Sequence, residues 1–382
     1  MKFIHLSDLH IGKVVNGFSM LDEQRNVFNQ VLKYIKKEKP TAVLIAGDIY
    51  DRVIPGVEAI RLFDDFLTEL SCENVTVMII AGNHDSPDRI NYASRLLSEK
   101  NIILYGAFNG DMQKCVLKDE YGKVNFWLLP FIKPFSVREY FKNNEIESYD
   151  DALNIILKNS DIDYSSRNVL VSHQFFTKDG VTLFRSESEL NSVGGLDAIN
   201  AELIEKFDYA ALGHLHGEQS VGSEHIRYAG SPIKYSFSEW QQKKSITLIE
   251  LNKKNDLKIT SLPLKPIHDM REIKGKIDNL MSDEVSSLGN KKDYLRVILT
   301  DELEIIDPIG KLRSVYPNVM CIDFDNSRKN IDAGTIYADS EDIKKLSPYD
   351  LFCEFFLKSQ GSVMTEEQIK ITRELLEQEE AV

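Results

Sequence analysis

Short apolar runs, each ending in a polar loop rich in Asp, His, Asn and Gly, recur along the N-terminal part of this chain. The pattern predicts strands at Lys2–Leu6, Ala42–Ala46 and Val75–Ala81, with apolar residues at helical spacing between them. This alternation predicts an α/β fold, and the irregular later connections favour a two-sheet sandwich flanked by helices. The later predicted strands are Asn125–Leu129, Asn168–Ser172, Tyr209–Leu212, Ile226–Ala229, Ser245–Leu251 and Leu257–Leu262.

Two prolines, Pro263 and Pro266, mark the end of this block, and the pattern of strands and helices then starts again. We therefore expect residues 1–264 to form one large domain and residues 265–340 to form a small α/β domain. The elements predicted in the small domain are, in order, a helix, a strand, a helix and a strand, at Ile273–Ser287, Tyr294–Leu299, Pro308–Val315 and Val319–Asp323.

Residues 341–382 differ from both preceding regions and predict a C-terminal helical tail. Tyr349–Leu357 predicts a short, strongly apolar helix that ends at Gly361. The run from Thr365 to Gln368 is a capping box, which opens a final acidic helix. So much apolar surface is rarely left in water. The tail therefore either docks on a partner protein or folds back on its own domain.

Charge and cysteine usage narrow the class of protein. The chain has 46 Lys and Arg against 60 Asp and Glu, a formal charge of −14 that disfavours indiscriminate binding of a polyanion. Its four cysteines are far apart in sequence, which favours reduced thiols. Uncharged runs are shorter than the roughly 18 apolar residues of a membrane helix, and no apolar leader precedes the first strand. We expect a cytoplasmic protein without membrane contact.

The candidate functional residues follow the ends of predicted strands. In an open α/β sheet, the loops at the carboxyl ends of adjacent strands meet in one crevice. The side chains there that can ligate a metal are Asp8, His10, Asp48, Asn83, His173, His214 and His216. Seven ligands are too many for one ion, so a carboxylate that bridges two ions accounts for the set.

The ligand types also favour particular ions. Imidazole, carboxylate and amide groups together suit manganese, iron or zinc better than calcium, and the lack of cysteine disfavours a structural zinc site. Each short motif alone is weak, and His5, His225 and His268 are interpreted as structural histidines. Five such segments in one order favour a functional metal centre, because so many buried polar groups are costly without a cation.

These motifs resemble the five motifs of the calcineurin-like metallophosphoesterase superfamily. They lie at residues 8–10, 47–48, 82–85, 173 and 213–216. Further segments, at residues 47–52, 82–87, 228–239 and 263–266, are similar to a bacterial DNA-nuclease branch of that superfamily. The resemblance covers nearly the whole chain and is most specific through Glu239. It implies a metallophosphoesterase sandwich, a small domain that caps DNA, and a helical tail.

The resemblance also implies roles for individual residues. One ion would be held by Asp8, His10, Asp48 and His216, and the second by Asp48, Asn83, His173 and His214. Mn²⁺ is the expected ion at both positions, with Mg²⁺, Fe²⁺ and Zn²⁺ as alternatives. His84 would face the scissile phosphate as a hydrogen-bond donor or general acid, and Asp85 would orient it.

The activity implied is 3′–5′ exonuclease action on double-stranded DNA ends and endonuclease action on single strands or hairpins, in DNA recombination, repair and replication. The chain has no Gly-x-x-x-x-Gly-Lys-Ser/Thr segment and so offers no P-loop for ATP. The resemblance implies that a separate coiled-coil ATPase partner handles ATP. The resemblance implies a homodimer of nuclease subunits within a heterotetramer, with residues 341–382 docking on that ATPase.

Two alternatives stay open at this point. A phosphatase or small nucleotide phosphodiesterase of the same superfamily would use the same ligands, although such an enzyme has no need of the extra domain at 265–340. A non-catalytic scaffold that binds DNA ends is the alternative from a different class. Because every ligand position is filled and His84 is present, a degenerate enzyme is disfavoured.

Overall fold

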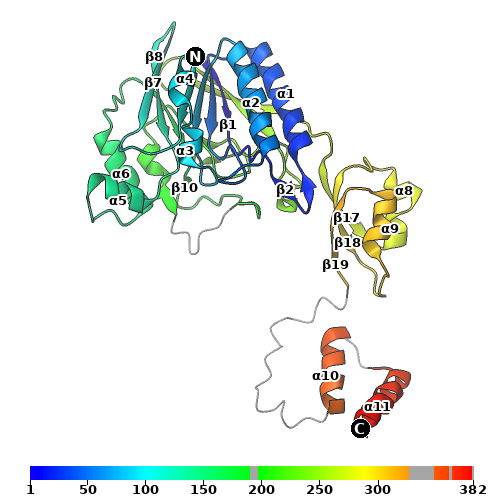
Figure 1. Cartoon of the computed structure of the whole chain (residues 1–382). Helices are drawn as coiled ribbons and strands as arrows, with labels where there is room; N and C mark the ends of the chain where they lie inside the picture. Colours follow the sequence, from blue (N-terminus) through cyan, green and yellow to red (C-terminus); the bar gives the residue numbers. More distant parts are fainter. Residues whose placement is uncertain (190–196, 327–347, 361–363, 381–382) are drawn as a thin grey trace. The chain divides into compact units, whose positions relative to one another are not determined.

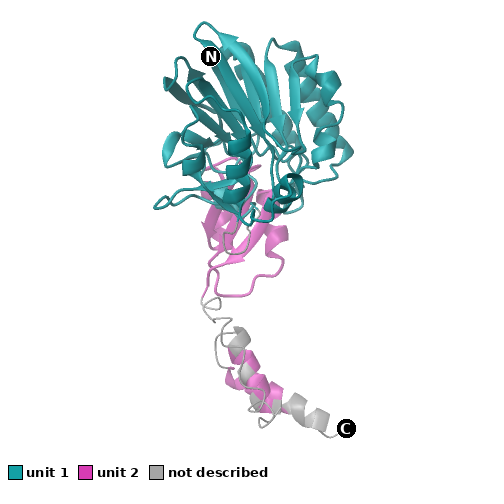
Figure 2. Ribbon diagram, turned by 90° about the vertical axis from the view of Figure 1, so that its left-hand side faces the viewer, with its two compact units in different colours: residues 1–269 teal, residues 270–382 magenta. Residues whose placement is uncertain are grey.

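The computed structural model of the chain describes residues 1–189, 197–326, 348–360 and 364–380 (Figure 1). It divides into two compact units, residues 1–269 and residues 270–382, which are described separately below (Figure 2). The predicted domain boundary at residue 340 lies outside the described residues.

Two six-stranded sheets form the first unit. The first sheet has the order β16-β15-β1-β4-β5-β6; the four strands from β1 to β6 run parallel, and β15 and β16 are antiparallel to their neighbours. Its strands are β1 (Lys2–Leu6), β4 (Ala42–Ala46), β5 (Thr76–Ile80), β6 (Ile102–Tyr105), β15 (Ser245–Leu251) and β16 (Leu257–Pro263).

The second sheet has the order β13-β14-β12-β9-β8-β7, and its four central strands are parallel. Its strands are β7 (Gln113–Asp119), β8 (Gly122–Leu129), β9 (Arg167–Ser172), β12 (Tyr209–Leu212), β13 (Gln219–Val221) and β14 (Ser223–Tyr228). Two small ribbons accompany the sheets, β2 (Val14–Val15) with β3 (Phe18–Ser19), and β10 (Phe175–Thr177) with β11 (Ala198–Asn200).

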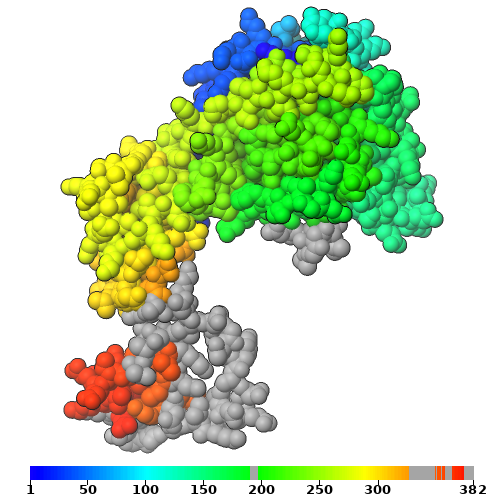
Figure 3. Space-filling view, turned by 180° about the vertical axis from the view of Figure 1, so that it is seen from behind, coloured from blue at the N-terminus to red at the C-terminus, as the bar shows by residue number. Residues whose placement is uncertain are grey.

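The two sheets pack face to face around an apolar core. Phe3 of the first sheet contacts Phe126 and Tyr209 of the second, with ring centroids 5.6 and 5.8 Å apart. Such burial of aromatic rings stabilises the sandwich by the hydrophobic effect. Seen from behind, the surface of this unit is formed mainly by its later residues, coloured green to yellow-green (Figure 3).

Helices cover both outer faces of the sandwich. α1 and α2 lie side by side on the first sheet, with Phe28 stacked on Phe66 at 4.6 Å (Figure 1). α5 and α6 pack on the second sheet through a separate apolar core. The helices of this unit are α1 (Leu21–Glu38), α2 (Val57–Cys72), α3 (Pro87–Ile90), α4 (Ser94–Ser98), α5 (Pro134–Phe141) and α6 (Tyr149–Asn159). The predicted sandwich flanked by helices is confirmed.

The sequence pattern did not reveal three strands of the sandwich, β6, β7 and β13. β6 and β7 each form one edge of a sheet and pair on one side only. Along β7, partly buried and exposed residues alternate, so it lacks the continuous apolar run of a buried strand. Ser86 precedes α3 with Pro87 at its first position, but its side chain makes no capping hydrogen bond, and the helix has only four residues.

The second unit begins with a three-stranded parallel sheet, in the order β17-β18-β19. The helix predicted at Ile273–Ser287 is wrong: the chain forms β17 first and then two short helices. Ile273, Ile277 and Leu280 have helical spacing, but pairing of β17 with β18 overrides it. The elements are β17 (Met270–Gly275), α7 (Ile277–Leu280), α8 (Asp283–Ser286), β18 (Tyr294–Leu299), α9 (Pro308–Val315) and β19 (Val319–Phe324).

Two helices close the chain, α10 (Pro348–Gln360) and α11 (Glu366–Glu380). The predicted capping box of α11 is formed, because Thr365 N donates to Gln368 Oε1 at 2.9 Å and Gln368 N donates to Thr365 Oγ1 at 3.3 Å. The Arg373 guanidinium lies over the ring of Tyr349, 4.9 Å from its centroid. The helix end expected at Gly361 lies outside the described residues.

None of the helices in the described ranges is long and apolar enough to cross a membrane. The four cysteines are unpaired. Cys72 is exposed, and Cys115, Cys321 and Cys353 are partly buried.

Candidate metal centre

Five parallel strands deliver the predicted functional residues to one end of the sandwich. Asp8 and His10 follow β1, Asp48 follows β4, and Asn83 follows β5. In the second sheet His173 follows β9, and the remaining two histidines, His214 and His216, follow β12. Because β1, β4 and β5 are parallel to one another, and β9 is parallel to β12, their carboxyl ends lie at the same edge of each sheet.

Several of these residues have an unusual backbone conformation. Asp8, His10 and Asp48 have φ angles of 52°, 42° and 50°, and His214 has a φ of 108°. Non-glycine residues avoid this region, at a cost of order 1–3 kcal/mol each, unless the surrounding structure imposes it. Strain of this kind collects at functional sites.

One group of ligand atoms consists of Asp8, His10 and His216, whose side-chain donors lie within 4.8 Å of one another. All three residues are buried, with exposed fractions of 0%, 0% and 1%. Nε2 of His10 faces Nε2 of His216 at 3.1 Å. The three side chains therefore converge on one small volume.

A second group surrounds the amide of Asn83. Its Oδ1 lies 3.0 Å from Nε2 of His173 and 3.3 Å from Nδ1 of His214. His173 Nε2 also lies 3.3 Å from Oδ2 of Asp48. Four predicted ligands thus meet at a second point.

Asp48 lies between the two groups. Its Oδ2 is 3.5 Å from His10 Nε2 and 3.3 Å from His173 Nε2. Its Oδ1 accepts a hydrogen bond from the backbone N–H of His84 at 2.9 Å. The structure brings all seven predicted ligands together, with this carboxylate in contact with both halves.

The donor set fits a cation. His173 Nδ1 donates to the carbonyl of Ala46 at 2.7 Å, so Nε2 is the nitrogen that faces the oxygens of Asp48 and Asn83. Nε2 of His214 is buried and has no hydrogen-bond partner. Acceptor atoms that face one another across about 3 Å repel unless a positive charge lies between them.

The electrostatics of the same atoms agree. Burial alone would lower the pKa of His173, but the Asp48 carboxylate overrides it and raises the pKa to about 9. Burial dominates at His214 and lowers its pKa to about 3, so this ring stays neutral. The Asp48 carboxylate therefore favours a positive charge at His173, and His214 offers an uncharged imidazole. Both properties suit the binding of a divalent cation.

Two glycines allow the loops to approach this closely. A Cβ on Gly82 would lie 2.1 Å from Oδ1 of Asp48, and one on Gly213 would lie 2.0 Å from the carbonyl of Ala46. No side chain fits in either place. The space beside the carboxylate and beside His173 therefore depends on these residues.

His84 and Asp85 lie beside the cluster but act on different partners. Nδ1 of His84 lies 3.1 Å from the carbonyl of Asp51, and its ring packs edge to face on His10. Both oxygens of Asp85 accept backbone N–H bonds, at 2.9–3.0 Å, from Ile49, Tyr50 and Gly82. Asp85 thus ties two loops together instead of orienting the His84 ring, which was its predicted role.

Sequence reasoning gave no role to several buried or partly buried side chains that contact the candidate ligands. Gln24 donates to the carbonyl of His10 at 2.7 Å and to the hydroxyl of Tyr235. Ser188 and Glu239 adjoin the ring of His216. Tyr235 and Glu239 belong to the segment at residues 228–239 that resembles the family, so the sequence gave a reason to single them out. The sequence gave no such reason for Ser188.

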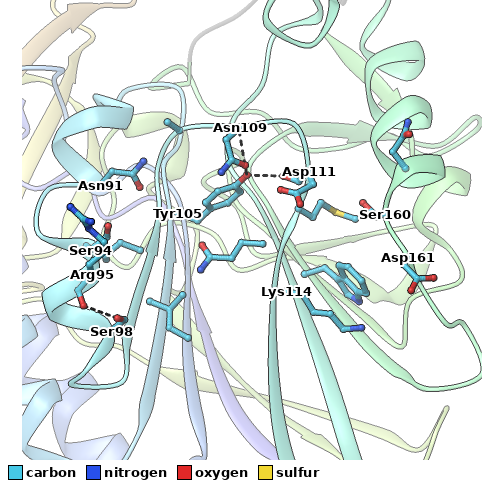
Figure 4. Close-up of a pocket in the computed structure, with 17 residues that line it drawn as sticks. Asn91, Ser94, Arg95, Ser98, Tyr105, Asn109, Asp111, Lys114, Ser160 and Asp161 are labelled. Atoms are coloured by element: carbon cyan, nitrogen blue, oxygen red, sulfur yellow. Dashed lines mark hydrogen bonds between the residues drawn. The ribbon is translucent and has the colours of Figure 1, made fainter. Parts of the chain in front are cut away.

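A separate open cavity of about 900 Å³ lies between the edges of the two sheets (Figure 4). Tyr105, Asn109 and Lys114 line it beside Arg95 from α4. None of the predicted ligands lines this cavity. The metal-ligand cluster and the cavity are therefore different places in the fold.

Comparison with protein families agrees with this geometry. Residues 1–218 match the calcineurin-like phosphoesterase family, and residues 266–360 match the Type 5 capsule protein repressor C-terminal domain family. A solved dimetal phosphatase from Danio rerio is 10% identical, with a TM-score of 0.38, over 69% of this chain and 96% of that one. By the family match, the chain belongs to the calcineurin-like phosphoesterases and is a hydrolase.

Two individual relatives identify the family of this chain within the calcineurin-like phosphoesterases. The SbcD component of the SbcCD nuclease of Staphylococcus epidermidis is 33% identical over 86% of this chain and 87% of its own length. The protein of the same name from Staphylococcus saprophyticus is 32% identical over 97% of this chain and 96% of its own length. The chain belongs to the SbcD family of nuclease subunits.

Proposed function

We propose that this chain hydrolyses DNA phosphodiester bonds with two divalent cations, as the nuclease subunit of an SbcCD-type complex. The observation that carries the proposal is the position of Asp48, whose Oδ2 lies within 3.5 Å of ring nitrogens from both ligand groups. Asp8, His10 and His216 would hold one cation with Asp48; the other ligands, all around Asn83, would hold the second. Mn²⁺ is the ion proposed for both positions.

Two cations bound there would neutralise charge on the phosphodiester and lower the pKa of a water molecule that attacks phosphorus. The residues contribute a rigid, buried frame: five of the seven ligands are at most 2% exposed. Burial keeps the local dielectric low, so that each charge acts more strongly on the substrate than it would in water.

His84 supplies the proton in this scheme. Attack on phosphorus breaks the bond to a sugar oxygen, and that oxygen needs a proton as it leaves. His84 Nδ1 donates to the carbonyl of Asp51, so Nε2 is the ring nitrogen left for the substrate. His84 is only partly buried, which lets substrate reach it; in the protonated ring, Nε2–H donates its proton to the leaving oxygen.

The test compares Mn²⁺-dependent cleavage of an end-labelled duplex and of bis-p-nitrophenyl phosphate by the wild type and two variants. We expect His84→Gln to bind Mn²⁺ but lose DNA cleavage, and Asp48→Ala to lose both. Cleavage of the small ester with intact DNA, even beside the ATPase partner, would favour a phosphatase and contradict the proposal. Binding of DNA ends with no hydrolysis of either substrate would favour the scaffold alternative.

We also propose that α10 and α11 dock on an SbcC-type coiled-coil ATPase. Phe352, Phe355 and Leu357 of α10 are 39%, 64% and 45% exposed, an apolar surface suited to a partner helix. Deletion of residues 345–382 should abolish co-purification with the ATPase, and Phe352→Ala/Phe355→Ala should weaken it. Lys370→Ala, an exposed change on α11, is the matched control; unchanged binding after the deletion would overturn the idea.

We further propose that the nuclease chain forms a homodimer. Residues 265–340 would cap DNA, and the protein would be located in the cytoplasm. Phe63 is buried in α2, but Ile60 on the same helix is 43% exposed. Tyr92 and Leu96 are 81% and 71% exposed. Ile60→Asp and Tyr92→Asp should each shift the mass measured by light scattering from dimer to monomer; a monomeric wild type would contradict this.

A further inference from the structure

The ring of His216 is held from behind by a buried chain of hydrogen bonds that ends in a carboxylate. Its Nδ1 lies 2.7 Å from the hydroxyl of Ser188, and that hydroxyl donates to Oε1 of Glu239 at 2.9 Å. Ser188 belongs to the loop between β10 and β11, and Glu239 to the short 3₁₀ helix Phe237–Glu239. Two segments remote from β12 therefore meet behind this ligand.

The direction of each hydrogen bond follows from its groups. A carboxylate only accepts, so the single proton of the Ser188 hydroxyl goes to Glu239. The serine oxygen must then accept from Nδ1–H of His216. This fixes the ring in the tautomer that has its lone pair on Nε2, the atom that faces His10 at 3.1 Å.

Glu239 is itself fixed in place. It is fully buried, and its Oε2 forms an ion pair with the buried Lys244 at 2.6 Å. Lys244 Nζ also donates to the backbone carbonyl of His216 at 2.8 Å and to the hydroxyl of Ser231 at 2.9 Å. The same ion pair thus holds both the side chain and the backbone of the ligand.

We propose that Ser188 and Glu239 are positioning residues, which hold the ring of His216 with the Nε2 lone pair aimed at the metal position. The inference rests on the proposed two-metal function and adds the device that prepares one ligand. Groups that orient a metal-bound histidine usually change metal affinity by about 10–100-fold when they are removed. Ser188 is the sharper test, because a change at Glu239 leaves Lys244 buried without its partner.

The experiment measures Mn²⁺ binding to the full chain by calorimetry, and the visible spectrum of the Co²⁺-loaded chain, for three serine variants. Ser188→Ala removes the hydroxyl, whereas Ser188→Thr retains it. Ser186→Ala is the control for loss of a hydroxyl from the same cluster: Ser186 Oγ donates to the same Glu239 oxygen at 2.6 Å and lies 2.8 Å from Ser188 Oγ, but it makes no bond to His216. Thermal unfolding of each variant checks that it is folded.

We expect Ser188→Ala to weaken one of the two Mn²⁺ sites by about 10-fold and to alter the Co²⁺ spectrum. Ser188→Thr should restore both, and Ser186→Ala should match the wild type. Wild-type affinity in Ser188→Ala, or equal losses in both alanine variants, would overturn the positioning role while leaving the metal centre intact. A wild-type chain that binds no Mn²⁺ would instead overturn the metal centre and this inference together.

Discussion

Two buried polar clusters lie at opposite ends of the same sandwich, and they are built differently. At the amino ends of the strands, the first residue of β9, Arg167, donates to both oxygens of Asp119 at 3.0 and 2.5 Å. Its remaining donors reach the carbonyls of Gly122 and Leu251. Each charge there meets an opposite charge or a hydrogen-bond partner.

At the carboxyl ends of the strands, nitrogen and oxygen atoms of the candidate ligands face one another. His10 Nε2 faces His216 Nε2, and His173 Nε2 faces the oxygens of Asp48 and Asn83. The comparison teaches that burial and polarity alone do not mark a functional site, since both clusters have them. The mark is a set of ligand atoms from several strand ends that converge within about 3 Å of one another, where a cation could lie between them.

The largest expected effect comes from Asp48→Ala. It removes the carboxylate shared by both ligand groups, so we expect Mn²⁺-dependent hydrolysis to fall by more than about 10³-fold. The melting temperature should also fall, because the buried ring of His173 and the backbone N–H of His84 both lose their partner. Phosphodiester hydrolysis and calorimetric metal titration measure these effects. Asp64→Ala, an exposed carboxylate on α2, is the control, and retained metal binding by Asp48→Ala would contradict the account.

His84→Gln should lower DNA cleavage by roughly 10²–10³-fold while both metal affinities stay within about twofold of the wild type. The reason is that the closest contacts of His84 with the cluster are its backbone N–H and its ring packing, although a ring nitrogen also lies within 4.8 Å of ligand atoms of His10 and Asp48. Parallel turnover and binding assays separate the two quantities. Weakened metal binding would contradict this prediction and would mean that His84 is itself a ligand, together with Asp8, His10 and His216.

Asp119→Ala tests the other end of the sandwich. It leaves the buried Arg167 without its carboxylate, so we expect a loss of about 3 kcal/mol in the free energy of unfolding. Urea denaturation measures this loss. Hydrolysis under folded conditions should be unchanged, because Asp119 lies at the amino ends of the strands. A loss of activity without a loss of stability would contradict the structural role given to the cluster of Arg167 and Asp119.

The smallest effect is a pH dependence of stability. The hydrogen bond from Arg167 holds the pKa of Asp119 below its ordinary value of 3.8. A carboxyl with a lowered pKa in the folded state adds stability above its unfolded pKa and loses it as the pH falls. The difference in melting temperature between the wild type and Asp119→Asn should therefore shrink between about pH 6 and about pH 3. A constant difference would show that the charge of Asp119 does not matter.

Much of the fold was predictable because buried strands have a recognisable sequence pattern. β1, β4, β12 and β15 have the predicted bounds, since buried strands are continuous apolar runs. The edge strands β6 and β7 and the strand β17 were not predictable, since pairing partners decide them and local residues do not. Helical spacing of Ile273 and Ile277 was simply outweighed by the pairing of β17 with β18.

The candidate site divides in the same way. Ligands that directly follow strands, such as Asp48 and His173, could be predicted from position and residue type. Ser188 could not, because its role depends on a loop returning across the fold to His216. Asp85 was assigned to the wrong neighbour, since a carboxylate next to a histidine in sequence need not touch its ring.

The most direct test of the central claim is a crystal of the full chain soaked in MnCl₂, with an anomalous difference map recorded at the manganese edge. The account predicts two peaks about 3.5–4 Å apart, one on each side of Asp48 and both in contact with its carboxylate. His216 should ligate one ion through Nε2, and His173 the other. A single peak, or peaks that do not contact Asp48, would contradict the two-metal centre.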